Sequence, residues 1–335
     1  MSNSSLPYSN ASRWTNYSSN FRDNFQYYYI ATVTVDTIFT VAGTLINVWF
    51  LAAMLLSPEI RARMRNKIIC GVLVVNLTES LILCPITAIR AASMLIGVYH
   101  KFDCSFQTIH NIIYHIQDFV GNWYILILLC VYMVQIVNFE PRFTPLWKTI
   151  LTGVILISPL IFALLFVPLT MKSYYLRYSD DRCLITTYQA IKVFKALDTI
   201  VPQALASLLL VVTAVFKYRR YPQEHSFDTL RAQLIDDRSQ IDPLKPFIAL
   251  LVTAVVTDLP MVVAFMSPLL FIRLGFHVWV SLYLVFGIVT YLRLIIVPLV
   301  MLLFPDIRER IKTWRPCGRS ALSADLVVTY EKNTS

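Results

Sequence analysis

The sequence predicts an all-α membrane protein, a seven-transmembrane helix bundle with a short amphipathic helix after span seven. Seven stretches of the 335 residues are long and apolar enough to cross a bilayer, because about 20 helical residues span its hydrocarbon core. Hydrophobic residues make up 57% of the chain and charged residues only 15%, and the mean hydropathy is +0.61. An ordinary soluble domain carries about 25% charged residues. Burial in lipid explains this composition.

The seven apolar segments define the predicted spans. Each is expected to be helical, because a segment in lipid must pair its backbone N–H and C=O groups internally. The expected spans are approximately residues 29–56, 68–95, 106–138, 149–170, 190–216, 246–271 and 278–304. Little of the chain remains for a soluble domain.

Residues 1–28 are polar and aromatic and precede the first span. They contain three N-glycosylation acceptor patterns, at Asn3, Asn10 and Asn16. They lack the basic start and apolar run of a cleavable signal peptide. We therefore expect this segment to be a glycosylated extracellular tail.

The orientation of the chain is predicted from the connection between spans one and two. This connection carries Arg61, Arg63, Arg65 and Lys67 against the single acidic residue Glu59. Basic loops next to membrane helices remain on the cytoplasmic side. With an odd number of spans, the amino terminus is then extracellular and the carboxyl terminus cytoplasmic. We expect a multi-pass protein of the plasma membrane.

Residues 305–316 are predicted to form an amphipathic helix on the inner membrane surface. The segment begins with Pro305, which suits the first turn of a helix. Ile307, Ile311 and Trp314 then share one helical face. An apolar face of this kind lies against lipid headgroups and acyl chains.

The remaining residues, 317–335, are expected to form a cytoplasmic tail. Cys317 follows the amphipathic helix directly and is a candidate for palmitoylation, which would add a second membrane anchor. An unmodified thiol is the alternative interpretation.

Composition also argues against several other classes of protein. The net charge of +9 is explained by basic loops beside apolar spans, so we expect no nucleic-acid partner. The six cysteines are scattered, and none has the CxxC spacing of a zinc or redox site. We therefore expect no metal and no cofactor. No catalytic motif is present, and we expect no enzymatic activity.

Seven spans, an extracellular amino terminus and an amphipathic helix after span seven together resemble the rhodopsin-like (class A) G-protein-coupled receptors. The residues that carry the resemblance are Asn47 in span one, Cys104 with Cys183, and Pro202, Pro260 and Pro298 in spans five, six and seven. The resemblance implies a disulfide between Cys104 and Cys183 that holds the second outer loop over a cavity. It also implies that the three prolines bend their helices and act as hinges.

The chain departs from this family at three motifs. The Asp-Arg-Tyr triplet at the end of span three falls near residues 128–130, Leu-Leu-Cys, and the nearest polar triplet is 138–140, Asn-Phe-Glu. The span-seven motif Asn-Pro-x-x-Tyr is replaced at residues 297–301, and the span-six motif Cys-Trp-x-Pro at residues 257–260. The chain is thus a divergent member, and G-protein coupling has less motif support than the fold.

Three ionisable residues stand out inside predicted spans: Asp118 in span three, Asp258 in span six and Arg293 in span seven. Such residues cost at least a few kcal/mol unless they face the bundle and have partners. We expect Arg293 to pair with Asp118, Asp258 or both, replacing the sodium ion that relatives bind with a fixed cation. A structural ion pair with no switching role is the alternative.

Several polar residues are expected near this pair. The acidic residue that relatives keep in span two is replaced by Asn76, and Asp118 supplies a negative charge from span three. Glu79 either joins the cluster or extends to the membrane surface. Asn47 and Asn76 are expected to form hydrogen bonds across helices. The candidate residues of a buried polar switch are Asn47, Asn76, Asp118, Asp258 and Arg293.

The outer half of the bundle is expected to hold a ligand cavity. The aspartate with which relatives bind amines in span three is replaced by Asn111, and the retinal-binding lysine of opsins by Tyr291. His115 is either a cavity residue or a hydrogen-bonded core histidine. Lys192 and Lys195 either lie near Asp198 in the outer half of span five or extend to the membrane surface. The candidate ligand-binding residues are Asn111, His115, Asp198 and Tyr291.

Three functions agree with these observations. The first is a receptor that binds an extracellular ligand, a peptide or a small chemosensory molecule, and signals to a heterotrimeric G protein through movement of spans five and six. The second is a receptor-fold protein that no longer couples to G proteins and acts as a scaffold or heteromer partner. The third is a transporter, which the absence of an internal repeat and the count of 8 glycines disfavour.

Overall fold

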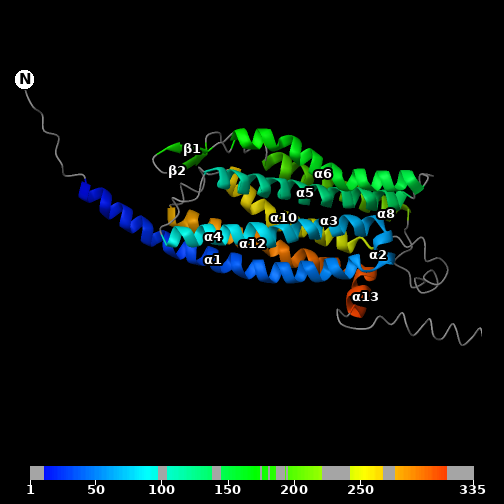
Figure 1. Ribbon diagram of the computed structural model, residues 1–335. Coiled ribbons are helices and arrows are strands. Elements are labelled where there is room, and N and C mark those ends of the chain that lie inside the picture. The colour runs from blue at the N-terminus through cyan, green and yellow to red at the C-terminus, as the bar shows by residue number, and fades with distance from the viewer. Residues whose placement is uncertain are drawn as a thin grey trace, which may run out of the picture.

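The structure of the protein is a computed structural model that describes residues 11–96, 104–137, 145–173, 176–179, 182–185, 193, 195–220, 242–266 and 276–314. Figure 1 shows an elongated bundle of helices that run along one another, with strands β1 and β2 at one end and helix α13 at the other. We call these ends the hairpin end and the α13 end.

Seven segments of the bundle are long and apolar enough to cross a membrane, so the predicted seven-helix fold is confirmed and the chain is a multi-pass membrane protein. The helices are α1 (Ala11–Leu55), α2 (Pro58–Ala62), α3 (Met64–Thr78), α4 (Cys84–Leu95), α5 (Cys104–Val137), α6 (Pro145–Ser173), α8 (Val201–Arg220), α10 (Lys245–Met266), α12 (Phe276–Met301) and α13 (Pro305–Thr313). Two π-helical segments, η2 (Glu79–Leu83) and η4 (Ala196–Ile200), complete spans two and five.

Two features of the hairpin end differ from the sequence prediction. Helix α1 begins at Ala11, so it continues through much of the segment expected as a tail, although its apolar part begins only at Gln26. No proline or glycine occurs in residues 11–28, so nothing interrupts the helix that the membrane span nucleates. The connection between spans four and five contains strands β1 (Leu176–Ser179) and β2 (Arg182–Ile185), an antiparallel pair that was not predicted.

Each π-helical segment ends just before a proline. Pro85 follows η2 by two residues, and Pro202 follows η4 by two residues. Proline has no N–H for the preceding turn, and a wider π turn relieves the clash of its ring with that turn. The predicted hinge at Pro202 therefore lies at the junction of η4 and α8. The other two predicted hinges, Pro260 and Pro298, lie inside α10 and α12.

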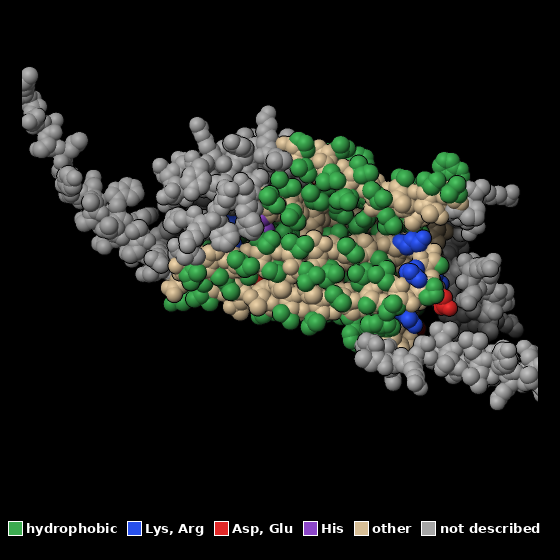
Figure 2. All heavy atoms as spheres, viewed as in Figure 1, with side chains coloured by type: hydrophobic (Ala, Val, Ile, Leu, Met, Phe, Trp, Pro, Cys, Tyr) green, Lys and Arg blue, Asp and Glu red, His purple; other side chains and the backbone are tan. Residues whose placement is uncertain are grey.

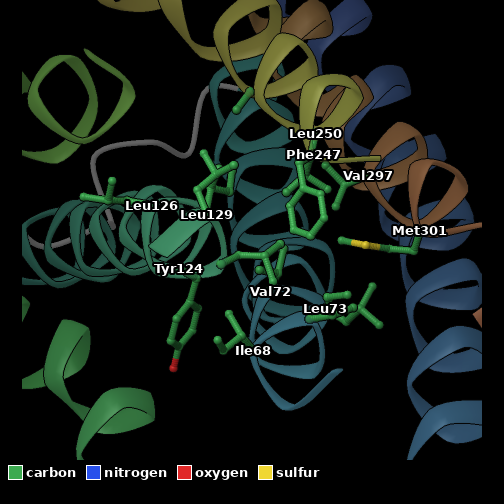
Figure 3. Close-up of a cluster of buried hydrophobic side chains, with 14 of the residues drawn as sticks. Ile68, Val72, Leu73, Tyr124, Leu126, Leu129, Phe247, Leu250, Val297 and Met301 are labelled. Carbon is green, nitrogen blue, oxygen red and sulfur yellow. The ribbon is translucent and has the colours of Figure 1, made fainter. Parts of the chain in front are cut away.

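The half of the bundle nearer the α13 end has a continuous hydrophobic core. In Figure 3, Val72 and Leu73 of α3 lie around Phe247 of α10 and Met301 of α12. Phe247 stacks on Tyr132 of α5, with ring centroids 4.0 Å apart. Spans two, three, six and seven thus meet in one tightly packed layer.

The predicted amphipathic helix after span seven is confirmed as α13. Ile307 on its apolar face is fully buried, and Trp314 packs edge-on against Trp49 of α1 with ring centroids 5.3 Å apart. On the face in Figure 2, hydrophobic side chains cover the length of the bundle, and Lys and Arg side chains gather at the α13 end. The apolar band is the surface that lipid covers.

Gly71 of α3 makes a close helix contact with the ring of Tyr124, whose hydroxyl donates to the carbonyl of Leu156 at 2.7 Å. A Cβ at Gly71 would lie 2.9 Å from Cε2 of Tyr124. We expect Gly71→Ala to lower the stability by about 1–3 kcal/mol, measured as thermal unfolding in nanodiscs. The matched control is Gly153→Ala, since no heavy atom lies within 4 Å of a Cβ there and alanine favours a helix. Equal melting temperatures for the two variants would contradict this account.

Candidate functional site

Arg293 of α12 lies in the centre of the bundle and contacts three carboxylates. Its Nη2 lies 2.7 Å from Glu79 Oε2 and 3.0 Å from Asp118 Oδ1. Its Nη1 lies 3.3 Å from Asp258 Oδ1. A guanidinium has five N–H donors, and a buried guanidinium needs several acceptors to offset its lost hydration. The three carboxylates supply these acceptors. The predicted pairing of Arg293 is thus found with both aspartates, and it joins spans two, three, six and seven.

Glu79 belongs to this cluster and does not extend to the membrane surface. Its side chain is fully buried, and Gln117 Nε2 donates to the same Oε2 that binds Arg293, at 2.7 Å. Span two therefore supplies a negative charge of its own, from a position three residues after Asn76. The other oxygen, Oε1, has no hydrogen-bond partner among the described residues.

Lys195 lies near Asp198 and does not extend to the membrane surface, which was the alternative interpretation. Its side chain is buried, with Nζ 2.8 Å from Asp118 Oδ2 and 3.1 Å from Asp198 Oδ2. The ammonium also lies 4.8 Å from the ring centroid of Tyr114. Two buried carboxylates and an aromatic face hold the ammonium inside the bundle, away from the interface. Lys192 lies outside the described residues.

Gln203 of α8 ties span five to spans three and six. Its Nε2 lies 3.2 Å from Asn122 Oδ1, 3.3 Å from the carbonyl of Ala254 and 3.3 Å from Asp258 Oδ2. One amide group is thus shared between α5 and α10. Sequence analysis did not select Gln203, because a single glutamine in an apolar segment has no periodic signal.

We use the name polar core for the buried residues Glu79, Gln117, Asp118, Lys195, Asp198, Gln203, Asp258 and Arg293. It contains four carboxylates and two cations, so negative charge is in excess when all are ionised. The residues come from five spans. Because a buried charge without a partner is costly, a shift of one span requires the contacts of the others to rearrange.

The two asparagines of the predicted switch behave differently. Asn47 Nδ2 donates to the carbonyl of Gly43 at 2.8 Å and to that of Leu294 in α12 at 2.9 Å, which is the predicted cross-helix bond. Asn76 Nδ2 makes no hydrogen bond to any described residue, so its predicted cross-helix bond is not formed. Glu79 is the span-two residue that reaches Arg293.

A cavity of about 450 Å³ lies toward the hairpin end, between α1, α4, α5, α10 and α12. This volume is in the range of pockets that hold small organic ligands. Asp118, Lys195 and Asp258 belong both to the polar core and to the wall of this cavity. A bound molecule would therefore touch the groups that link the helices.

Three of the four predicted ligand-binding residues line the cavity, namely Asn111, His115 and Tyr291. The fourth, Asp198, is not among the residues that line this cavity, and its role in ligand binding stays a prediction. The π turn of η4 places its carboxylate, fully buried, beside Lys195 and 3.5 Å from His115 Nδ1.

Two charged cavity residues were missed by sequence analysis. Asp36 of α1 and Arg90 of α4 both line the cavity. Asp36 is buried, with 1% of its surface exposed. The available signal was an ionisable residue inside an apolar span, the same signal that singled out Asp118.

The side chains of several predicted sites lie outside the described part of the structure. Cys104 is the first residue of α5 and Cys183 lies in β2, and the partner strand β1 contacts α5. The side chains of both cysteines lie outside the described residues, so the disulfide stays a prediction. The same holds for glycosylation at Asn3, Asn10 and Asn16 and for palmitoylation at Cys317.

A second ionic cluster lies at the α13 end. Arg65 of α3 is buried, forms ion pairs with Asp242, which precedes α10, and with Asp306 of α13, and lies 4.4 Å from the ring centroid of Phe304. Asn66 Nδ2 donates to Asp306 Oδ2 at 3.0 Å. Burial raises the pKa of Asp242, although the Arg65 guanidinium beside it opposes the rise. We call these residues the α13-end cluster.

No protein-family model matches the chain, and no curated protein matches it significantly. Function is therefore inferred from the polar core, the cavity and the α13-end cluster. Within the described part of the chain, no group of His, Cys, Asp and Glu side chains is arranged to hold a metal ion.

Proposed function

We propose that the chain is a receptor of the rhodopsin-like type in the plasma membrane. An extracellular ligand binds in the cavity at the hairpin end, and a heterotrimeric G protein binds at the α13 end. The amino terminus is then extracellular and the carboxyl terminus cytoplasmic. The Lys and Arg side chains gathered at the α13 end in Figure 2 support this orientation, because basic residues favour the cytoplasmic side.

The observation that carries this proposal is the shared wall between the cavity and the polar core. Asp118, Lys195 and Asp258 face the cavity, and Asp258 also holds α10 to Arg293 of α12. A ligand that binds one of these groups competes with their contacts inside the core. Such a ligand has different affinities for two arrangements of the helices, and it shifts the population toward one of them.

Helix α10 connects the cavity to the α13 end. Asp258 lies two residues before Pro260, where the helix lacks one hydrogen bond and bends more easily. The same helix carries Phe247 in the hydrophobic layer, and Asp242 just before it pairs with Arg65. When the contact between Asp258 and Arg293 is released, we expect α10 to move and the α13-end cluster to open toward a G protein.

The first test removes the α13-end cluster. We expect Arg65→Gln to raise basal G-protein activation about 5- to 30-fold per receptor at the cell surface, because about 1–2 kcal/mol is lost from the closed arrangement. Asp242→Asn is expected to act in the same direction. Arg308→Gln is the matched control, since Arg308 is exposed and pairs only with the exposed Glu309 among the described residues. A signal from Arg65→Gln equal to that of the control would contradict the proposal.

A second candidate function is a receptor-fold protein that does not couple to G proteins. The observation that favours it is the lack of arginine at both sequence positions expected for the Asp-Arg-Tyr triplet, residues 128–130 and 138–140. For such a protein, Arg65→Gln would change stability without any effect on G-protein activation. The experiment above therefore separates the two candidates.

A further inference from the structure

Asp36 is a buried carboxylate that the polar core does not use. It lies on α1, lines the cavity, and neither of its oxygens has a hydrogen-bond partner among the described residues. The phenol of Tyr291 is its polar neighbour but does not reach hydrogen-bond geometry. A carboxylate buried in this way is costly unless a cation joins it.

The cations near the cavity do not pair with Asp36. Arg293 and Lys195 contact carboxylates of the polar core. Arg90 lines the cavity, but within the described residues it forms no ion pair with Asp36. The partner that would balance the charge of Asp36 is therefore not supplied by the described chain.

The walls around Asp36 suit an organic cation. The rings of Tyr28, Tyr29, Tyr283 and Tyr291 line the same cavity, and aromatic faces attract ammonium groups. The wall also contains more acidic than basic side chains, and this imbalance favours a cationic ligand. The acidic side chains are Asp36, Asp118 and Asp258, and the basic ones are Arg90 and Lys195.

We infer that Asp36 binds the ammonium group of the ligand, and that the receptor proposed above takes a small cationic amine with an apolar body. Relatives in the resembled family bind amines through an aspartate of span three, which Asn111 replaces here; Asp36 supplies the carboxylate from span one. A cavity of about 450 Å³ fits a small molecule and not a folded peptide. Binding of the amine does not depend on the proposed function. The inference rests on that function only in expecting that binding leads to a signal.

The test uses three probes with the same phenyl ring and ethylene linker: the cation phenethylamine, the neutral 2-phenylethanol and the anion 3-phenylpropionate. The thermal unfolding of the purified full chain in nanodiscs is measured with each probe up to about 10 mM, because fragments of this size bind with Kd near 1 mM. We expect phenethylamine to raise the melting temperature more than the two other probes do.

Three variants assign the effect to Asp36. Asp36→Asn keeps the size of the side chain. We expect it to weaken the binding of phenethylamine at least about 10-fold and to leave the response to 2-phenylethanol unchanged. Asp36→Glu keeps the charge and should retain a preference for the amine. Arg90→Gln alters another charged residue of the cavity wall and should bind phenethylamine at least as well as the wild type.

Three results would overturn the inference. They are an equal response of Asp36→Asn and wild type to phenethylamine, a larger response to 3-phenylpropionate than to the amine, and no response to the amine at the highest concentration. The proposed function fails separately. If the amine binds in a way that depends on Asp36 but activates no G protein, the inference is supported and the proposed function is contradicted. If the amine activates a G protein equally in the wild type and in Asp36→Asn, the proposed function is supported and the inference is contradicted.

Discussion

Replacing Arg293 with alanine is expected to lower the free energy of unfolding by about 3–5 kcal/mol and to remove most of the protein from the cell surface. The substitution leaves Glu79 and Asp258 buried without the one cation that each contacts among the described residues. Asp118 keeps Lys195, so its charge remains partly balanced. The loss thus comes from two stranded carboxylates and from the broken connection between four spans.

Thermal unfolding in nanodiscs and surface labelling of intact cells measure this effect. The matched control is Arg308→Ala, because Arg308 is exposed and its ion pair with Glu309 is 3.6 Å long. Such surface pairs contribute about 0–1 kcal/mol. Arg293→Lys keeps the charge without the planar fork and should fall between the two variants. If Arg293→Ala unfolds at the temperature of Arg308→Ala, Arg293 does not hold the bundle together.

The second largest effect is expected for Lys195→Met, which removes the cation between Asp118 and Asp198. We expect a loss of about 3 kcal/mol in the free energy of unfolding, because Asp198 is fully buried and has no other fixed cation within the described residues. Adding Asp198→Asn to this variant should recover part of the loss, because the stranded charge is then neutralised.

A double-mutant cycle of these two substitutions measures their coupling. We expect a coupling of about 0.5–3 kcal/mol, as for residues in one ion-pair network. Lys312→Met is the surface control, since Lys312 and its partner Glu309 are both exposed. Strictly additive effects of Lys195→Met and Asp198→Asn would contradict the ion pair.

The spans were predictable from the sequence because each needs a fixed length of apolar residues. The start of α1 at Ala11 was not predictable in this way, because hydropathy marks the apolar part of a helix and not its polar extension. The hairpin was missed because its strands are only four residues each, which is too short for a hydrophobic pattern to identify a strand. Length and apolar content thus predict the helices that cross the membrane, but not the structure of the polar segments outside it.

The pairing of Arg293 was predictable because a buried cation requires a carboxylate nearby. The full set of partners was not, since it depends on the rotation of each helix. The π-helical segments η2 and η4 turn Glu79 and Asp198 into the bundle, and helical periodicity does not reveal such turns. The signal that was present is a proline at Pro85 and at Pro202, just after each segment.

Asp36 was missed for a different reason. Sequence analysis singled out ionisable residues in spans two, three, six and seven and did not consider span one. The structure places it in the cavity wall, where a ligand can supply the partner. An ionisable residue inside a span that has no evident partner of opposite charge is therefore a candidate for ligand binding.

The most direct test of the proposed mechanism is basal G-protein activation in cells for the wild type and Asp258→Asn, normalised to receptor at the surface. Asparagine keeps the size of the side chain, and Arg293 retains Glu79 and Asp118, so mainly the link between α10 and α12 is weakened. We predict activation above mock-transfected cells for the wild type and a higher level for Asp258→Asn. If both reach the surface and neither activates any class of G protein, the chain does not signal in the proposed way.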